Sequence, residues 1–132
     1  MSKENMKIVR TVFDATNRGD WDTVLAAYSA DTEWDDRDLR PEGAVHRGID
    51  AMRAEMRAWF GTWSDYGQEI EQAIDAGEHV VVVVRERGTG KGSGAVMDQR
   101  LGVVITLRAG LIVRTRLYRE PAEALAVVDL AD

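Results

Sequence analysis

Cysteine is absent from the 132-residue sequence, and proline and histidine each occur only twice. Without cysteine the chain can form neither a disulfide nor a cysteine-ligated metal site, and this composition is typical of a reducing cytoplasm. No apolar run approaches the roughly 20 residues of a membrane-spanning helix, and the segment Met1–Lys7 is too polar for a signal peptide. We therefore expect a cytoplasmic protein with no membrane partner.

Net positive charge is also lacking, since the formal charge at pH 7 is −6. A nucleic-acid-binding protein needs a basic patch that releases counterions from phosphates. The later arginines could form a local basic stripe, but we interpret them as solubilising charges on the outer face of a sheet. They are Arg85, Arg87, Arg100, Arg108, Arg114, Arg116 and Arg119. No nucleic-acid partner is expected.

The chain does contain periodic hydrophobic segments of the kind found in one small domain, and we assign residues 1–132 to that domain. Apolar spacing of three and four residues predicts a helix over Met6–Thr16, which Gly19 ends. Asp20 is a suitable N-cap for a second, short helix, with an expected face of Trp21, Val24, Leu25 and Tyr28. A third helix is expected after Asp50, with a buried side of Met52, Met56, Trp59, Phe60 and Trp63.

Alternating and β-branched segments predict the strands. The first, Thr32–Asp36, places Trp34 and Asp36 on the same side. The others are Tyr66–Ala76, Val80–Arg87, Val96–Arg108 and Leu111–Tyr118, and Pro121 then opens a last helix. Helices followed by consecutive hairpins predict an α+β fold with helices on one face of an antiparallel sheet.

Several segments carry a resemblance to a known family. They are Asn17–Trp21 with Tyr28–Trp34, His46–Ala51, Ile105–Val113 and Arg119–Leu125. In order and spacing they resemble the SnoaL-like and nuclear transport factor 2-like proteins, over nearly the whole chain. The resemblance implies a cone-shaped half-barrel of the cystatin-like type, in which a curved antiparallel sheet wraps around N-terminal helices.

The same resemblance implies a deep pocket for a small hydrophobic molecule, no cofactor, and a homodimer built through the sheet face. The family includes polyketide cyclases, ketosteroid isomerases, epoxide hydrolases and proteins that only bind, so the fold alone does not give the function. If the domain only dimerises, with its cavity filled by its own aromatics, sheet-face residues such as Val104 and Thr106 would matter most.

Asp36 is the main candidate for chemistry, because it ends the first predicted strand on the side of Trp34. By the resemblance it takes the place of the carboxylate base of ketosteroid isomerases. A carboxylate that faces an apolar pocket can shuttle protons. The alternative is that the charged run Asp35–Asp38 forms a solvated acidic turn, and the sequence leaves both interpretations open.

Arg85 and His46 complete the candidate catalytic group. By the resemblance, Arg85 corresponds to an arginine of the epoxide hydrolases, and an inward guanidinium would orient a carboxylate or an anionic oxygen. Arg87 lies on the same side of the strand, and solvent exposure of both is the alternative. His46 could act as a general acid or base at the pocket mouth, although anchoring a loop is the commoner role. Two histidines so far apart are a weak basis for a metal site, and we expect no metal.

The pocket wall is expected to be mainly apolar, as small-molecule sites are. Gln99 and Thr115 are expected to face inward, and the other predicted wall residues are Tyr28, Trp34, Met52, Met56, Trp59, Trp63, Arg87, Met97, Leu101, Val103 and Leu117. By the resemblance, Val12 and Val103 replace the tyrosine and the carboxylic acid of ketosteroid isomerases. Arg87 and Leu117 likewise replace the two aspartates of epoxide hydrolases. Both of those mechanisms are therefore disfavoured.

Two classes of function remain open. The first is a cofactor-free isomerase, lyase, cyclase or hydrolase acting on a hydrophobic carbonyl-bearing substrate, with Asp36 as general acid/base and Arg85 and Gln99 steadying negative charge. An arginine beside Asp36 would favour water activation or anchoring, whereas an isolated Asp36 would favour proton abstraction. The alternative is a non-catalytic ligand-binding or dimerisation module of the same fold, which a pocket without an inward ionisable pair would indicate.

Overall fold

The computed structural model describes the backbone of residues 2–131 and the side chains of residues 3–127. The helices are α1 (Ser2–Arg18), α2 (Trp21–Ala26), α3 (Ile49–Phe60) and α4 (Pro121–Ala131), and the strands are β1 (Tyr28–Asp35), β2 (Val45–Arg47), β3 (Trp63–Ala76), β4 (His79–Gly90), β5 (Val96–Arg108) and β6 (Leu111–Tyr118). Within residues 2–131, no helix combines the length and the apolarity needed to cross a membrane. The element order confirms the predicted α+β class.

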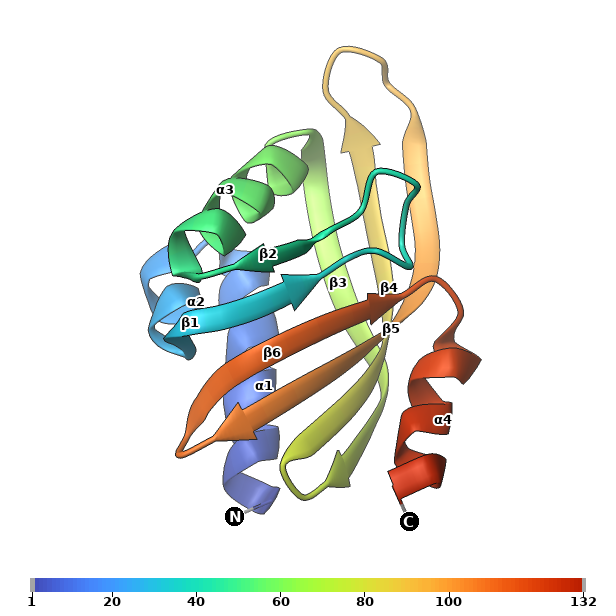
Figure 1. Cartoon of the computed structure of the whole chain (residues 1–132). Helices are drawn as coiled ribbons and strands as arrows, with labels where there is room; N and C mark the ends of the chain where they lie inside the picture. The colour runs from blue at the N-terminus through green and yellow to red at the C-terminus, as the bar shows by residue number, and fades with distance from the viewer. Residues whose placement is uncertain (1, 132) are drawn as a thin grey trace.

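The six strands form one curved, open sheet in the order β2-β1-β6-β5-β4-β3, and the N-terminal helices lie against it as predicted (Figure 1). Neighbouring strands are antiparallel except β1 and β6, which run parallel with Trp34 opposite Thr115. The predicted antiparallel sheet therefore contains one parallel pair. No hairpin joins β1 to β6, so the sequence between them does not force an antiparallel pairing.

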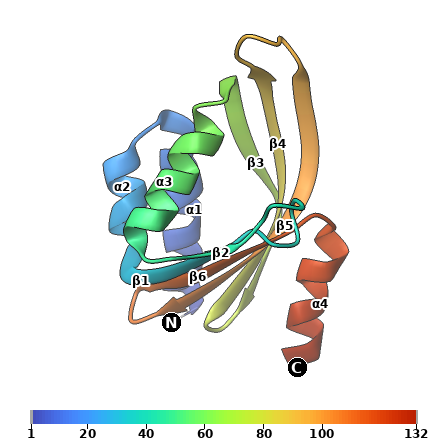
Figure 2. The same cartoon turned by 45° about the horizontal axis from the view of Figure 1, so that its top comes forward.

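Helices cover both faces of the sheet (Figure 2). α1, α2 and α3 lie on the inner, concave face, whereas α4 lies alone on the outer face. α4 is so close to β5 that a Cβ atom at Gly102 would come within 2.4 Å of the Cβ atom of Ala124. The prediction that the helices share one face is therefore wrong for α4. Since Val104 packs in the cluster beneath this helix, it is not part of a free sheet face.

The run Val80–Val84 is buried on both faces because helices cover both faces of the sheet. Val80, Val82 and Val84 belong to the main core beside the N-terminal helices, whereas Val81 packs with Ala124 of α4. None of the five valines is more than 7% exposed. The predicted burial of this strand on both faces is confirmed, because an uninterrupted apolar run suits a strand covered on both sides.

Three of the differences between predicted and observed element boundaries concern residues of the predicted site. Tyr28 begins β1 instead of belonging to the second helix, which ends with Ala27 as its C-cap. Trp63 begins β3, because α3 closes at Gly61, whose N–H donates to the carbonyl of Arg57. Residues 45–47, predicted as loop, form β2 because His46 pairs with Trp34 of β1. Each difference reflects pairing or capping that the local hydrophobic pattern does not encode.

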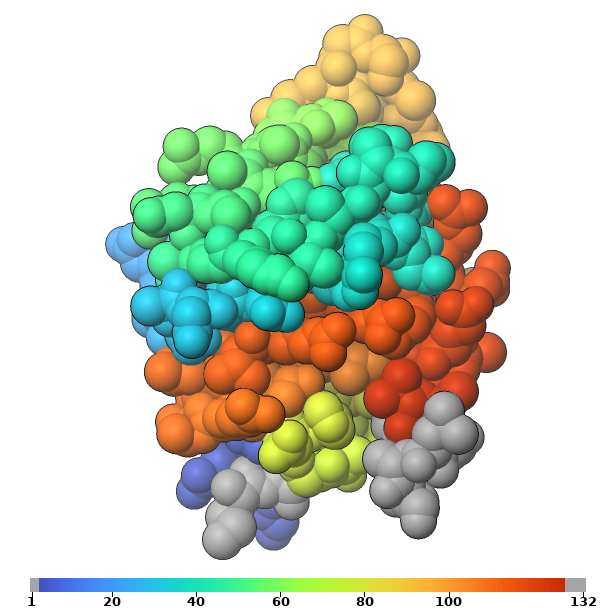
Figure 3. All heavy atoms as spheres, viewed as in Figure 1, coloured from blue at the N-terminus to red at the C-terminus, as the bar shows by residue number. Residues whose placement is uncertain are grey.

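The β4–β5 connection projects from the surface (Figure 3). Residues 91–95 join the two strands, and Gly92 and Gly94 adopt φ angles of 86° and 72°. Glycine takes such left-handed conformations without steric strain. This hairpin tip therefore extends the sheet without contributing to the core.

Candidate functional site

A cavity of about 90 Å³ lies between the N-terminal helices and the inner face of the sheet. Its wall is mainly apolar and includes five aromatic rings, those of Phe13, Tyr28, Trp34, Trp59 and Phe60. Aliphatic side chains of β4, β5 and β6 supply the opposite wall: Val84, Leu101, Val103, Ile105 and Leu117. Such a cavity has the apolar character of a small-molecule site with few polar groups.

Asp36 lies in this wall, directly after the end of β1, and only 2% of the residue is exposed. The backbone N–H of Ala44 donates to Asp36 Oδ1 at 2.8 Å, and the N–H of Asp36 donates to the carbonyl of Ala44 at 3.1 Å. Gly43 allows this close return of the loop, because a Cβ atom there would lie 2.1 Å from the carbonyl oxygen of Asp36. The interpretation of Asp36 as part of a solvated acidic turn is therefore wrong.

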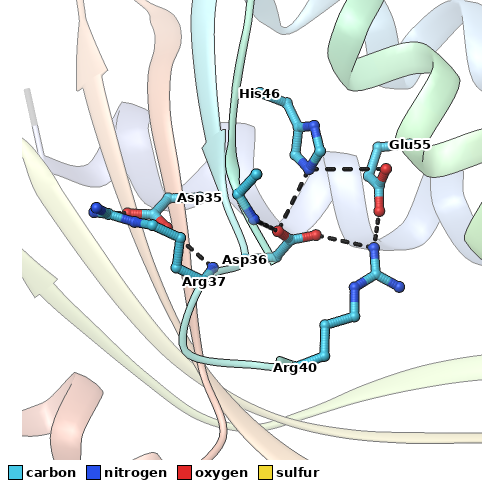
Figure 4. Close-up of polar contacts among 7 residues, drawn as sticks. Asp35, Asp36, Arg37, Arg40, His46 and Glu55 are labelled. Carbon is cyan, nitrogen blue, oxygen red and sulfur yellow. Dashed lines mark hydrogen bonds and ion pairs between the residues drawn. The ribbon is translucent and has the colours of Figure 1, made fainter. Parts of the chain in front are cut away.

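Of the described side chains that form an ion pair with Asp36, that of Arg40 lies nearest to the carboxylate. Its Nη2 lies 3.1 Å from Asp36 Oδ2 and also pairs with Oε1 of Glu55, which α3 presents from above the loop (Figure 4). A guanidinium between two carboxylates makes strong, charge-assisted hydrogen bonds. Asp36 therefore has a counter-ion that fixes its orientation.

His46 points at the same two carboxylates from β2 (Figure 4). Its Nε2 atom lies 3.4 Å from Asp36 Oδ1 and 3.7 Å from Glu55 Oε2. The side chain is 24% exposed, yet Nε2 itself is buried and makes no hydrogen bond with the described residues. His46 thus lies beside Asp36, close enough to exchange a proton with it after a small movement or through one water molecule.

Asp36, His46 and Glu55 offer ligand atoms that lie within 4.8 Å of one another, which is the spacing of a possible cation site. Two carboxylates and an imidazole suit several divalent metals. Arg40, however, already contacts both carboxylates and supplies positive charge between them. The arrangement is therefore an ion-pair cluster with its own cation, and the absence of a metal stays a prediction.

Asp35 is as buried as Asp36 but points to the opposite side (Figure 4). Arg37 donates to Asp35 from Nε at 3.0 Å and from Nη2 at 2.8 Å, and Arg114 and Arg116 each approach within 3.7 Å. The hydrogen bonds from Arg37 hold the pKa of Asp35 below its usual value, against the opposing effect of burial. Asp35 is therefore a structural carboxylate of the outer face.

A second polar group lies where β3 and β4 border the cavity. Glu86, 3% exposed, lines the cavity and accepts hydrogen bonds from Tyr66 Oη at 2.5 Å and from Gln99 Nε2 at 2.5 Å. Gln68, another wall residue, donates from Nε2 to Tyr66 Oη at 2.7 Å. Burial is the main cause that raises the pKa of Tyr66, and the negative charge of Glu86 raises it further. The phenol therefore stays a neutral donor.

Arg85 does not line this cavity, so the expectation that it points inward is not met. Val84 and Glu86 face the cavity, and alternation along β4 places Arg85 on the other side of the strand. There its guanidinium donates to Asp98 of β5 at 2.9 and 2.7 Å. Arg87 behaves in the same way and lies 3.9 Å from Glu69.

The predicted wall residues divide into two groups. Those that do line the cavity are Tyr28, Trp34, Met56, Trp59, Leu101, Val103, Thr115 and Leu117. Met52 lies in the core instead, Trp63 packs its ring edge-on against Trp59, and Met97 pairs with Gly88 near the hairpin tip. Gln99 lies outside the wall, donates to the wall residue Glu86, and borders an adjoining pocket with Arg40 and Trp59. Whether the lining residues bind a ligand stays a prediction.

Sequence reasoning missed several polar residues of the site: Arg40, Glu55, Tyr66, Gln68 and Glu86. Spacing could have revealed one of them. Glu55 lies three residues after Met52 and four before Trp59, on the helix face predicted to be buried. Glu86 shares a face of the strand with Val84, but the sequence does not indicate which face is the inner one, because Val80–Val84 is apolar at every position. Nothing in the local sequence indicates that Arg40 turns back onto Asp36.

The chain is similar to known proteins in both sequence and structure. Residues 9–115 match the SnoaL-like domain family. No curated protein matches the sequence. Among solved structures, a nuclear transport factor 2-like protein from Burkholderia pseudomallei K96243 is 25% identical, with a TM-score of 0.77 and coverage of 95% of this chain and 97% of that one.

Two further structures are similar at comparable levels. A nuclear transport factor 2-like protein from Burkholderia xenovorans LB400 is 27% identical, with a TM-score of 0.72 and 97% of each chain covered. A candidate polyketide cyclase from Sinorhizobium meliloti is 25% identical, with a TM-score of 0.70 and coverage of 84% of this chain and 93% of that one. Since the family match spans most of the sequence and the fold agrees, this chain belongs to the SnoaL-like domain family.

Proposed function

We propose that this protein is a cofactor-free acid–base enzyme that acts on a small hydrophobic carbonyl-bearing molecule, with Asp36 as its general base. The observation that carries the proposal is the buried carboxylate of Asp36 in the wall of an apolar cavity, held by Ala44 N and Arg40 and approached by His46. The resemblance of the chain to a candidate polyketide cyclase supports a carbonyl-bearing substrate.

Within the isomerase, lyase, cyclase and hydrolase classes, the local geometry favours reactions in which water is activated. Arg40 gives the ionised carboxylate a counter-ion, so Asp36 works as a fixed base and not as an isolated acid. A proton that Asp36 removes from water can pass to His46 and Glu55 at the pocket mouth. A positioned base of this kind contributes roughly 10²–10⁴-fold to a rate.

Unpaired polar atoms support a bound water molecule or substrate oxygen at this place. Arg40 Nε and His46 Nε2 are both buried and have no hydrogen-bond partner among the described residues. Buried polar atoms nearly always have a partner, which here a water molecule or a substrate would supply. Tyr28 adds a buried phenol whose pKa is raised by desolvation, so it remains a neutral donor for a carbonyl oxygen.

The inward ionisable groups also favour an enzyme over a module that only binds. Asp36, Arg40 and Glu55 all line the cavity, and its aromatic side chains leave open volume. Their catalytic role, the cytoplasmic location and a homodimer through the sheet face are parts of the proposal. The last of these would have to use the outer surface that α4 leaves uncovered.

Labelling with oxygen-18 water tests the proposal even while the substrate is unidentified. The protein is incubated with a panel of hydrophobic esters, epoxides and enones in labelled water, and products are analysed by mass spectrometry. We expect wild type to incorporate the label and Asp36→Asn to do so about 100-fold more slowly. Glu42→Gln is the matched control, because Glu42 is an exposed carboxylate of the same loop.

Equal rates for wild type and Asp36→Asn would contradict the assignment of Asp36 as the base. Binding of panel compounds with no turnover by the wild type would instead support the non-catalytic alternative. A parallel incubation in deuterium oxide distinguishes proton abstraction, because deuterium at carbon without oxygen-18 would contradict water activation.

A further inference from the structure

Glu86 is a buried carboxylate of the cavity that the proposed chemistry does not use. It lies on β4, two residues beyond Val84, at the end of the cavity bordered by β3, whereas Asp36 enters from the loop after β1. Its residue is 3% exposed and its side chain lines the cavity. A charged group removed from water needs compensation by hydrogen bonds or by an opposite charge.

Hydrogen bonds provide only part of that compensation. One Glu86 oxygen accepts from Tyr66 Oη and the other from Gln99 Nε2. A carboxylate can accept about four hydrogen bonds, so roughly half of its capacity remains. Gln68 turns its Nε2 atom to Tyr66, which leaves its Oε1 as a further acceptor of the same wall. This end of the cavity therefore offers unfilled acceptors.

No cation of the protein compensates Glu86 within the described side chains. Arg85 and Arg87 flank it in sequence, but they point to the other side of β4 and pair with Asp98 and Glu69. Arg40, which does line the cavity, pairs with Asp36 and Glu55. The donors that reach Glu86, a phenol and an amide, are neutral. Its counter-charge is therefore missing from the part of the chain that the structure describes.

The charged side chains and the aromatic rings that line the cavity both favour a cationic ligand. Three carboxylates line it, those of Asp36, Glu55 and Glu86, against the single guanidinium of Arg40. An anionic ligand would meet repulsion there, whereas a cation would be attracted. The faces of Trp, Tyr and Phe rings, which make up much of the wall, also attract cations.

We propose that the cavity binds a molecule with a protonated amine, which Glu86 and Gln68 hold while the apolar body lies against the aromatic rings. This proposal deepens the proposed function and rests on its use of the cavity as the substrate site. The carbonyl group of such an amino-carbonyl substrate would lie toward Asp36. The amine would bind at Glu86 and Gln68 and the carbonyl group at Asp36, so the two contacts together would fix the orientation of the molecule.

Three ligands with one ring test the proposal: benzylamine, benzyl alcohol and benzoate, titrated into the 132-residue protein by isothermal calorimetry and by NMR of the tryptophan indoles. We expect benzylamine to bind about tenfold more tightly than benzyl alcohol, and benzoate to bind most weakly, since hydrogen bonds to a charged partner are the stronger ones. Glu86→Gln keeps the shape of the side chain and should abolish the preference for the amine.

Glu69→Gln is the matched control, because it removes one negative charge from β3 at an exposed ion pair with Arg87. It should leave the preference for the amine unchanged. Loss of the preference in Glu69→Gln, its persistence in Glu86→Gln, or equal binding of amine and alcohol by the wild type would each overturn the proposal.

Asp36→Asn separates this proposal from the catalytic one. Because the amine is assigned to Glu86, the Asp36→Asn variant should still prefer benzylamine, and its loss of that preference would overturn the assignment. The binding experiment needs no turnover, so its result stands whether or not oxygen-18 is incorporated. Conversely, failure of the Glu86 test leaves the role of Asp36 as the base intact.

Discussion

Asp35 and Asp36 are neighbours in the sequence and both are buried, yet they belong to opposite faces of the sheet. Asp35 lies among three arginines, Arg37, Arg114 and Arg116, on the outer face. Asp36 lies in the cavity wall with one arginine and an unpaired histidine nitrogen. The excess of cations around Asp35 makes it structural, whereas the open side of Asp36 leaves room for a substrate.

The largest effect expected from this comparison is on catalysis. Asp36→Asn should lower turnover about 100-fold or more because it removes the base, while Asp35→Asn should leave turnover per folded molecule unchanged. Steady-state rates, corrected for the folded fraction by circular dichroism, measure the difference. Comparable losses of turnover in both variants would contradict the distinction between a catalytic Asp36 and a structural Asp35.

The second effect is on stability, and here the change is expected for Asp35 instead of Asp36. Asp35→Asn should lower the free energy of unfolding by about 1–2 kcal/mol at neutral pH, less than a fully buried ion pair would give because its arginines are half-exposed. Urea unfolding measures it, with Glu42→Gln as the exposed control. An unchanged midpoint would contradict a structural role for Asp35.

The pH dependence of that stability follows from the lowered pKa of Asp35, caused mainly by Arg37. A carboxyl whose folded pKa is lowered stabilises the fold above its unfolded pKa of about 3.9, and this stabilisation disappears as the pH falls through the folded pKa. The difference between wild type and Asp35→Asn should therefore be constant above about pH 5 and shrink below about pH 4. A difference that grows in acid would contradict the assignment.

A third effect concerns α4, the helix that packs on the outer face of the sheet. Gly102→Ala should destabilise the protein by about 1–3 kcal/mol, because its new methyl group would overlap Ala124 of α4. Ala124→Gly in the same chain removes the opposing methyl, and the double variant should recover part of the loss. Thermal unfolding of the four proteins completes the cycle, and additive losses would show that the two positions do not touch.

The smallest effect is expected for Arg85→Ala. Its guanidinium pairs with Asp98 on the outer face, away from the cavity. We expect turnover and amine binding to remain at the wild-type level, as measured by the oxygen-18 and calorimetric assays. A large loss of turnover would show that Arg85 reaches the substrate after all and would restore the role that the family resemblance implied.

Hydrophobic periodicity was sufficient to predict most of the architecture. The strands 96–108 and 111–118 have the predicted bounds, and Trp34 and Asp36 both face the cavity as alternation required. Seven further predicted apolar or hydroxyl wall residues also line it. These successes share a cause, since burial of one face imposes a period that the residues themselves display.

The ion pairs around Asp36 could not be predicted in this way. Arg40 and Glu55 are fifteen residues apart in the sequence and come together only because Gly43 lets the loop fold back beneath α3. The parallel pairing of β1 with β6 and the position of α4 on the outer face are likewise long-range choices. Local patterns contain no information about which distant element supplies the partner.

The sequence by itself determined the order of the helices and of every strand but β2, the apolar character of the cavity and the buried sides of α1 and α3, because these follow from residue spacing. It did not determine which face of β4 is the inner one. Val80–Val84 is apolar at every position, so the run contains no alternation to choose between Arg85 and Glu86. Only the tertiary structure made that choice, by placing the N-terminal helices on one face of the strand and α4 on the other.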